Sequence, residues 1–330
     1  MYKTKFISTG RAFPEKRITN EDLAKTVDTS DVWIQERTGI KARHVVDISK
    51  GESNSVLAYR ASKNALQNAG LYPQDIDFIL YATFTQDHPI PTNGCVLQEM
   101  LGAKRVGALD ISAACSGFVY GVGLADALIR AGIYKHILLV GSDVLSPYTN
   151  WKDRGTCILF GDGAGAALLG RASESEESQI YSTHLYSDGS LKDFFTLQAG
   201  GSSLPLSHAV LDQNLHFMQM KGREIFKVAV RMLCDCAVEA LEKNGFTIQD
   251  LDWLIPHQAN LRIIEAVAKR LRFPMEKVIV NIEEYGNTSA ATVPTALDEA
   301  VELKKIKRGD LVLMDVFGAG LTYGSALLRW

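Results

Sequence analysis

The chain has 330 residues, of which 46% are hydrophobic and 22% charged, a composition typical of a globular protein with a large core. A formal net charge of −3 argues against a protein that binds nucleic acid over its whole surface. The first ten residues lack the apolar core of a signal peptide, and no run of about 18 apolar residues predicts a transmembrane helix. Five cysteines, without zinc-ligand spacing, favour a reducing compartment. We therefore expect a cytoplasmic protein with no membrane or nucleic-acid partner and no bound metal.

The first half of the chain alternates predicted helices with apolar strands, which is the pattern of an α/β protein. In chain order we expect a short strand at the N-terminus, a loop over 11–17, a helix capped by Thr19 or Asn20, helices over 31–37 and 54–69, a strand over 78–82, a helix ending near residue 101, and strands over 106–111 and 137–140.

A glycine-rich turn over 160–165 leads into the next predicted strand. It has neither the lysine of a phosphate loop nor the spacing of a dinucleotide fingerprint, so we expect it to pack a strand closely against a helix. The polar, acidic run 172–179 predicts a solvated connection to the second half of the chain.

An internal repeat relates the two halves of the chain. The segment 65–80 matches the segment 240–255 at a constant separation of 175 residues. Because this period is far too long for a solenoid, we expect two copies of one α/β domain, over residues 1–173 and 174–330.

The repeat also predicts which side chains meet. Cys115 follows one predicted strand, and its counterpart in the second half lies near Asn287. His257 ends a strand that corresponds to the strand over 78–82. Sites in α/β proteins form at strand ends, so two facing copies would bring Cys115, His257 and Asn287 together at the centre of the molecule.

Cys115 lies at an expected junction between a strand and a helix that continues to about residue 132. This helix is apolar or small on every side, which predicts a helix buried all round. The positive potential of a helix N-terminus favours the thiolate, the nucleophilic form of cysteine. The alternative is that Cys115 is only a small buried hydrophobic residue. Its small neighbours, in the run Ala-Ala-Cys-Ser-Gly, favour the nucleophile.

His257 and Asn287 each have a structural alternative, as a hydrogen-bonded residue at a strand end and as a turn residue. Beside a thiol, the imidazole can donate or accept a hydrogen bond and the carboxamide can donate one. The same three residue types would also serve a cysteine hydrolase, in which asparagine orients histidine. The run 318–320 is either a tight turn or the source of a backbone N–H, from Gly320, that completes an oxyanion hole with the N–H of Cys115.

Basic side chains gather around the predicted helix that follows His257, although the whole chain is slightly acidic. They are Lys227, Arg231, Arg262, Lys269, Arg270 and Arg272. They form either a solvated face or a docking surface for an acidic partner. Elsewhere, Trp33, Arg37 and Arg154 have the ring and charges needed to stack on an adenine and to bind phosphates.

Together these motifs resemble the β-ketoacyl-acyl-carrier-protein synthase III family, the initiating condensing enzymes of type II fatty acid synthesis. The resemblance covers essentially the whole chain and depends on these segments: Asp31–Ile40, Ala114–Gly117, Asp153–Gly155, Phe160–Gly165, His257–Arg262 and Gly286–Ser289. It implies a thiolase-like five-layer αβαβα fold built from two duplicated halves, and a homodimer.

The resemblance also implies roles for individual residues. Cys115 would accept the acyl group, His257 and Asn287 would be the other catalytic residues, and the N–H groups of Cys115 and Gly320 would form the oxyanion hole. Coenzyme A would contact Trp33, Arg37, Thr38, Arg154 and Arg262. Acyl carrier protein would contact Gln258, Ala259, Asn260, Leu261 and Arg262. The acyl pocket would include Ile90 and Phe226.

The implied reaction has two halves. An acyl-coenzyme A would acylate Cys115, and malonyl-acyl carrier protein would then lose carbon dioxide. His257 and Asn287 would donate hydrogen bonds to the thioester oxygen on which enolate charge develops, and the carbanion would attack the acyl-Cys115. Coenzyme A is a substrate in this scheme, and no metal or redox cofactor is expected.

Two residues depart from the family pattern. Ile90 precedes Pro91 where many members have phenylalanine, in the loop that crosses to the partner's acyl pocket, so acetyl as the starter is not assured. Ala319 stands where a third glycine is common. The alternatives are a ketosynthase of the same fold in specialised metabolism with other acyl starters, a non-catalytic scaffold, and a cysteine hydrolase.

Overall fold

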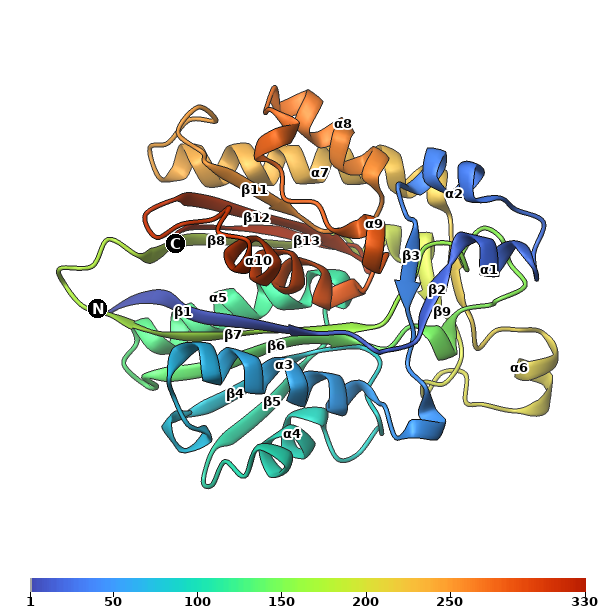
Figure 1. The fold of residues 1–330 in the computed structure, drawn as a ribbon, viewed down its shortest axis with the longest axis horizontal. Coiled ribbons are helices and arrows are strands. Elements are labelled where there is room, and N and C mark those ends of the chain that lie inside the picture. Colours follow the sequence, from blue (N-terminus) through green and yellow to red (C-terminus); the bar gives the residue numbers. More distant parts are fainter. Residues whose placement is uncertain (1) are drawn as a thin grey trace.

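The computed structural model of the protein describes residues 2–330. Two sheets alternate with three pairs of helices, so that five layers are stacked (Figure 1). The layers position the site because the ends of both sheets meet beside the central pair of helices.

The first sheet is built from residues 3–172 and has the strand order β1-β7-β6-β4-β5. β4 is parallel to β5 and β6, whereas β7 is antiparallel to β6 and to the edge strand β1. The strands span Lys3–Ala12 (β1), Phe78–Ala82 (β4), Gly107–Ile111 (β5), His136–Asp143 (β6) and Gly163–Ala172 (β7).

The second sheet is built from residues 179–329 and has the strand order β11-β12-β13-β8. β11 is parallel to β12, and β13 is antiparallel to both of its neighbours. The strands span Gln179–Ser187 (β8), Trp253–Pro256 (β11), Leu311–Gly318 (β12) and Thr322–Arg329 (β13).

Six longer helices form the other layers (Figure 1). α3 and α4 cover the outer face of the first sheet, α7 and α8 cover the outer face of the second, and α5 and α10 lie between the sheets. They span Asn54–Ala69 (α3), Asn93–Leu101 (α4), Gly117–Arg130 (α5), Gly222–Lys243 (α7), Leu261–Leu271 (α8) and Thr292–Glu302 (α10). The Ser53 hydroxyl caps α3, and Gly70 ends it at φ 66°, where a left-handed residue is needed.

The remaining elements gather at one end of the molecule, shown at the right in Figure 1. They span Arg17–Thr19 (β2), Asn20–Ala24 (α1), Asp31–Thr38 (α2), Ala42–His44 (β3), Phe195–Leu197 (β9), His208–Asp212 (α6), Met218–Met220 (β10) and Ile282–Tyr285 (α9). Of the two residues proposed to cap α1, Thr19 is the cap, and it forms a reciprocal capping box with Asp22.

The predicted repeat is present in the fold. β6 begins at residue 136 and β12 at residue 311, which are 175 residues apart, and α5 and α10 begin at residues 117 and 292, with the same separation. The predicted five-layer fold of two duplicated halves is therefore confirmed. The domain boundary at residue 173 stays a prediction, and it lies in the connection between β7 and β8.

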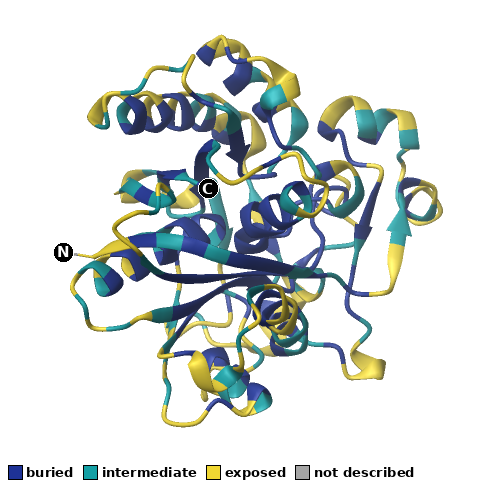
Figure 2. Ribbon diagram, turned by 60° about the vertical axis from the view of Figure 1, so that its left-hand side comes forward, coloured by how far each residue is buried: buried dark blue, intermediate teal, exposed yellow. Residues whose placement is uncertain are grey.

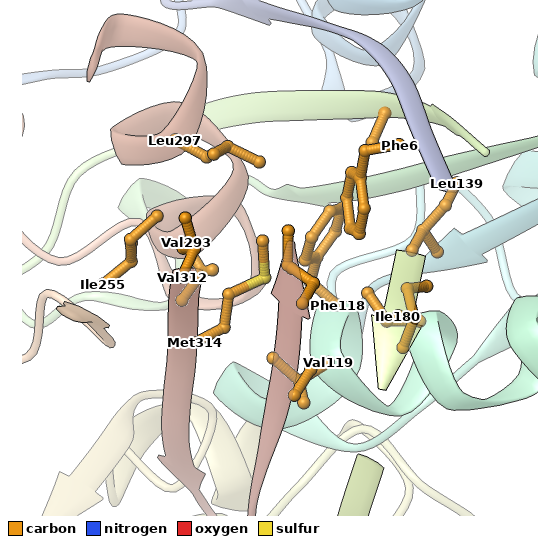
Figure 3. Packing of buried hydrophobic residues seen from close by; sticks show 14 of the residues in the cluster. Phe6, Phe118, Val119, Leu139, Ile180, Ile255, Val293, Leu297, Val312 and Met314 are labelled. Carbon is orange, nitrogen blue, oxygen red and sulfur yellow. The ribbon is translucent and has the colours of Figure 1, made fainter. Parts of the chain in front are cut away.

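The largest cluster of buried side chains lies around the two central helices. Leu139 of β6 and Met314 of β12 approach from the two sheets and pack with Phe118 of α5 and Val293 of α10 (Figure 3). Buried residues run through the strands and the inner helices, whereas exposed residues concentrate on the outer helices and loops (Figure 2). Each large apolar side chain buried here stabilises the fold by about 1.5–3 kcal/mol.

The prediction that the helix after Cys115 is buried all round is wrong. Leu124 of α5 is 41% exposed and Ala127 is also exposed. The reason is that one face of this helix is left uncovered by the rest of residues 2–330. No helix within residues 2–330 has the length and apolarity needed to cross a membrane.

Candidate active site

Cys115 lies in a tight 3₁₀ turn, Ala114–Ser116, at the N-terminal end of α5. The second half of the chain covers this turn closely. A Cβ atom on Gly318 would come within 2.8 Å of the Cys115 backbone nitrogen, so only glycine fits there without movement. The thiol is therefore enclosed, and Cys115 is 5% exposed.

His257 follows β11 and is held at several atoms. Its backbone N–H donates to the backbone carbonyl of Asp315 at 2.8 Å. Its ring atom Nδ1 lies 2.7 Å from the hydroxyl oxygen of Thr292. The Phe317 ring meets the imidazole edge-on, with ring centres 5.6 Å apart. These contacts leave Nε2 as the ring nitrogen that is free for a substrate.

Asn287 is held by the glycine-rich segment, which explains that motif. Its N–H donates to the Leu159 carbonyl at 2.8 Å, and its carbonyl accepts the Gly161 N–H at 3.1 Å. Its side-chain Oδ1 accepts the Ser289 N–H at 2.9 Å. The amide NH₂ group of Asn287 is therefore the part of the side chain that is available to donate. The close packing requires glycine at position 161, because a Cβ there would lie 2.4 Å from the Tyr285 carbonyl oxygen.

One cavity of about 110 Å³ is lined by Cys115, His257 and Asn287 together. Phe226 of α7, a predicted acyl-pocket residue, is also part of its wall. A second cavity, of about 390 Å³, is lined by Ala114 of the Cys115 turn and by Gly320, among others. The two cavities share the lining residues Phe195 and Ala319.

The helix N-terminus favours the thiolate of Cys115, whereas the burial of this residue favours the neutral thiol. Burial raises the pKa of the Cys115 thiol to about 12, because desolvation of the charge outweighs the helix N-terminus. Burial also lowers the pKa of His257 to about 3. The resting site therefore holds a neutral thiol beside a neutral imidazole.

The pKa of His257 predicts acid sensitivity of the fold. Between pH 6.5 and about 3 the unfolded chain binds a proton at this residue and the folded chain does not, so stability falls as the pH falls through this range. From pH 7 to about pH 5.5, the wild type should lose about 1 kcal/mol more free energy of unfolding than a His257→Gln variant. Urea unfolding at both pH values measures this difference. Equal losses in the two proteins would contradict a buried, neutral His257.

The residues predicted to hold coenzyme A lie partly together. The guanidinium groups of Arg37 and Arg154 stack over the Trp33 ring, at 4.5 and 4.7 Å from its centre. Asn260, which lines the cavity, donates to the Arg37 carbonyl at 3.0 Å and so joins this cluster to the cavity wall. Arg262 is exposed on the first turn of α8.

Two predicted contact residues, Thr38 and Gln258, have side chains that are bonded within the protein, and their assigned contacts stay predictions. Thr38 is 2% exposed, and its hydroxyl donates to the Ile34 carbonyl and accepts the Ile40 N–H. Gln258 is fully buried, and its amide bonds to the backbone of Pro256, Ile279 and Asn281.

Other predicted residues are placed at the rim or outside the two cavities. Ala259 lines the first cavity, and Leu261 packs against Gly39 at the end of α2. Ile90 is 87% exposed and lines neither cavity of its own chain. Gly320 lines the second cavity but not the first, whereas Ala319 lines both.

Sequence reasoning missed residues that support the three central side chains. Thr292 contacts the His257 ring, and Phe195 separates the two cavities. The repeat offers a signal for Thr292, because this residue lies 175 positions after Gly117, which starts the helix beside Cys115. No comparable pattern marks Phe195, which lies in a short strand that was not predicted.

A cavity between two repeated α/β halves, with a thiol from one half and an imidazole and a carboxamide from the other, defines a thiolase-like condensing enzyme. Family models agree: residues 109–189 match 3-oxoacyl-[acyl-carrier-protein (ACP)] synthase III, and residues 241–330 match the C-terminal part of that family. The chain belongs to the β-ketoacyl-acyl-carrier-protein synthase III family.

Individual members of the family are similar to this chain over nearly its full length. The β-ketoacyl-acyl-carrier-protein synthase III of Caldanaerobacter subterraneus is 48% identical over 98% of this chain and 97% of its own. The crystal structure of the synthase III from Aquifex aeolicus is 46% identical and superimposes with a TM-score of 0.91 over 99% of this chain and 100% of its own. A priming β-ketosynthase of the R1128 polyketide pathway has the same TM-score at 33% identity, over 99% of this chain and 96% of its own.

Proposed function

We propose that this protein condenses an acyl-coenzyme A starter with malonyl-acyl carrier protein, losing carbon dioxide and forming a 3-oxoacyl-acyl carrier protein. The observation that carries this proposal is the shared cavity of Cys115, His257 and Asn287. Curated relatives named β-ketoacyl-acyl-carrier-protein synthase III, at 45–48% identity, favour the initiating step of fatty acid synthesis over a role in specialised metabolism. The reaction needs no metal or redox cofactor, since coenzyme A enters as a substrate thioester.

In the first half-reaction, Cys115 attacks the acyl carbonyl carbon of the coenzyme A thioester. The new carbon–sulfur bond forms as the bond to the coenzyme A sulfur breaks, and the thiol proton leaves with that sulfur. Because the thiol is neutral at rest, deprotonation accompanies the attack.

Backbone N–H groups would stabilise the tetrahedral intermediate of this transfer. The sequence assigned this role to Cys115 and Gly320, and the position of Ala319 between the two cavities makes its N–H a second candidate beside that of Gly320. Removing one oxyanion donor from such a site typically slows a reaction by about 100-fold or more.

In the second half-reaction, the bond between the malonyl α-carbon and its carboxylate breaks, and carbon dioxide leaves. The electron pair moves onto the thioester oxygen, where His257 and Asn287 donate hydrogen bonds. The same pair then forms the carbon–carbon bond to the acyl group, and the Cys115 sulfur leaves and takes up a proton. No general base is needed to form this carbanion, so a carboxamide suits the position that a carboxylate would otherwise occupy.

The substrates would approach from the side of α2 and α8. Stacking on the Trp33 ring and charges from Arg37 and Arg154 suit an adenine nucleotide. The exposed basic side chains of α7 and α8 suit the acidic acyl carrier protein. They are Lys227, Arg231, Arg262, Lys269, Arg270 and Arg272.

A homodimer would complete the acyl pocket. β5 is the last strand of its sheet, and Leu109 on it is 49% exposed, although an apolar edge strand normally pairs or is covered. The exposed Ile90 would reach the second cavity of the partner, beside residues such as Leu197 and Met218. Five free cysteines, including the nucleophile, suit a reducing cytoplasm.

If two chains pair through β5, a charged residue introduced on this strand should separate them. Leu109→Lys should convert the protein from about twice its chain mass of 36.2 kDa to a monomer, because an unpaired ammonium opposes edge-to-edge pairing. Sedimentation or light scattering gives the mass. Val238→Lys is a matched control, since Val238 is 43% exposed on α7, and it should leave the dimer intact. A monomeric wild type would contradict the proposal.

The function is tested by supplying acyl-coenzyme A of several chain lengths together with malonyl-acyl carrier protein. Mass spectrometry of the carrier protein should show a 3-oxoacyl group, and the best starter identifies the size of the acyl pocket. Free fatty acid as the only product would instead identify a cysteine hydrolase, and unchanged substrates would favour a scaffold.

A further inference from the structure

The turn that holds Cys115 has a counterpart in the second half of the chain, and the two turns pack against each other. They span Ala114–Ser116 and Ser289–Ala291, which are 175 residues apart. Each turn begins with a residue in the left-handed region, Ala114 at φ 45° and Ser289 at φ 54°. The repeat and this packing place Ser289 beside Cys115, with a hydroxyl where the first half has only a methyl group.

The backbone of Ser289 is bound to residues that support the other two central side chains. Its N–H donates to Oδ1 of Asn287 at 2.9 Å. Its carbonyl accepts the Thr292 hydroxyl at 2.9 Å, and that hydroxyl oxygen lies 2.7 Å from Nδ1 of His257. These contacts use the peptide groups of Ser289 and not its side chain. A change of the side chain therefore leaves them in place.

The Ser289 hydroxyl itself is buried near two groups that can carry negative charge, the Cys115 thiol and the Asp143 carboxyl. Burial raises the pKa of both groups, and the Ser289 hydroxyl opposes this rise at each of them. Neither contact has the geometry of a hydrogen bond in the resting structure. Ser289 is 1% exposed, so its hydroxyl is a buried polar group without a partner among residues 2–330.

The Asp143 carboxyl does not depend on this hydroxyl for a donor. Its Oδ1 accepts the Thr85 hydroxyl at 2.8 Å and the Phe84 N–H at 3.1 Å, and its Oδ2 accepts the Ala290 N–H at 3.2 Å. A buried hydroxyl without a partner destabilises a fold, so its presence needs an explanation. The proton of the Ser289 hydroxyl is free for the Cys115 sulfur once that sulfur becomes charged, which supplies one.

We propose that Ser289 is a further catalytic residue, whose hydroxyl donates a hydrogen bond to the Cys115 sulfur whenever that sulfur carries negative charge. The inference rests on the proposed function, in which the sulfur is the nucleophile of the first half-reaction and the leaving group of the second. The hydroxyl keeps its own proton in both steps, so the bonds that form and break are unchanged. It lowers the cost of charge on a sulfur that is enclosed by protein.

The contact can be tested without any substrate, by alkylation of the thiol with iodoacetamide. The sulfur displaces iodide through its thiolate form, so the rate depends on how well the site supports charge on the sulfur. Ser289→Ala removes the donor, and Ala114 shows that alanine adopts this backbone conformation at the matching position. Alkylation of Cys115, followed by peptide mass spectrometry, should become slower by about fivefold or more. An unchanged rate would overturn the proposal.

Ser62→Ala is the matched control. Ser62 of α3 is fully buried, and its hydroxyl also lacks a partner among the described residues. Neither variant should lower the urea midpoint of unfolding, because each removes an unpaired hydroxyl. Only Ser289→Ala should slow alkylation of Cys115. Equal slowing by Ser62→Ala would overturn the proposal, because the effect would then not depend on contact with the sulfur.

A second variant covers the case in which Ser289→Ala does not fold. Ser289→Gly also removes the hydroxyl, and glycine adopts φ 54° without strain, so alkylation of this variant at the wild-type rate would equally overturn the proposal. Acylation by acyl-coenzyme A should slow by a similar factor in both variants. A wild type that iodoacetamide alkylates but acyl-coenzyme A does not acylate would reject the proposed function, whereas slower alkylation of Ser289→Ala would still support the contact between hydroxyl and sulfur.

Discussion

Replacing Cys115 with alanine is expected to abolish acyl-enzyme formation. The thiol is the one nucleophile among the three central residues of the cavity, and without it no carbon–sulfur bond can form. Intact-protein mass spectrometry after incubation with acyl-coenzyme A should show the mass of one acyl group on the wild type and none on Cys115→Ala.

The other buried thiols provide the control for this result. Cys157 is fully buried, and burial raises the pKa of its thiol to about 11, which resembles the environment of Cys115. It lines neither cavity, so Cys157→Ala should acylate like the wild type. Acylation that persists in Cys115→Ala would mean that another residue is the nucleophile.

Replacing Asn287 with aspartate is expected to slow condensation by at least about 100-fold. The change keeps the shape and the oxygen that accepts the Ser289 N–H, but it replaces the donating NH₂ group with an oxygen that repels the enolate. Single-turnover release of carbon dioxide measures the loss, while acylation of Cys115 should continue.

Asn68→Asp makes the same chemical change far from the cavity. The Asn68 amide donates to the Thr9 carbonyl at 2.9 Å, so this variant also loses a side-chain bond to the backbone. It should lose some stability but no rate of carbon dioxide release. Equal rates for Asn287→Asp and the wild type would show that the carboxamide does not contact the reacting oxygen.

Local signals predicted the regular elements well. The helix over 54–69 has the predicted ends because Ser53 caps its start and Gly70 supplies the left-handed residue at its end. The strand over 78–82 is a short apolar run that is buried on both faces, and it too has the predicted bounds. The repeat at 175 residues then predicted which strand ends meet. The positions of Cys115, His257 and Asn287 in the chain could not have predicted this, because they are far apart in sequence.

Properties that depend on the opposite half of the molecule were not predictable. The thiol of Cys115 is protonated because residues such as Gly318, about 200 positions later, enclose it. Thr38 and Gln258 were assigned contacts because of their motif, but the fold turns their side chains inward. One face of α5 is exposed because no other element of the chain covers it. The spacing of apolar residues along the helix does not reveal this.

The central claim is that a thiol from one half and two donors from the other carry out a single condensation. The most direct test is a chase of isolated acyl-enzyme with malonyl-acyl carrier protein, in which the mass of the Cys115 adduct and the carbon dioxide released are followed together. We predict that the adduct disappears as one carbon dioxide and one 3-oxoacyl-acyl carrier protein form for each acyl group lost. An adduct that leaves as free acid, or that malonyl-acyl carrier protein does not remove, would contradict the account.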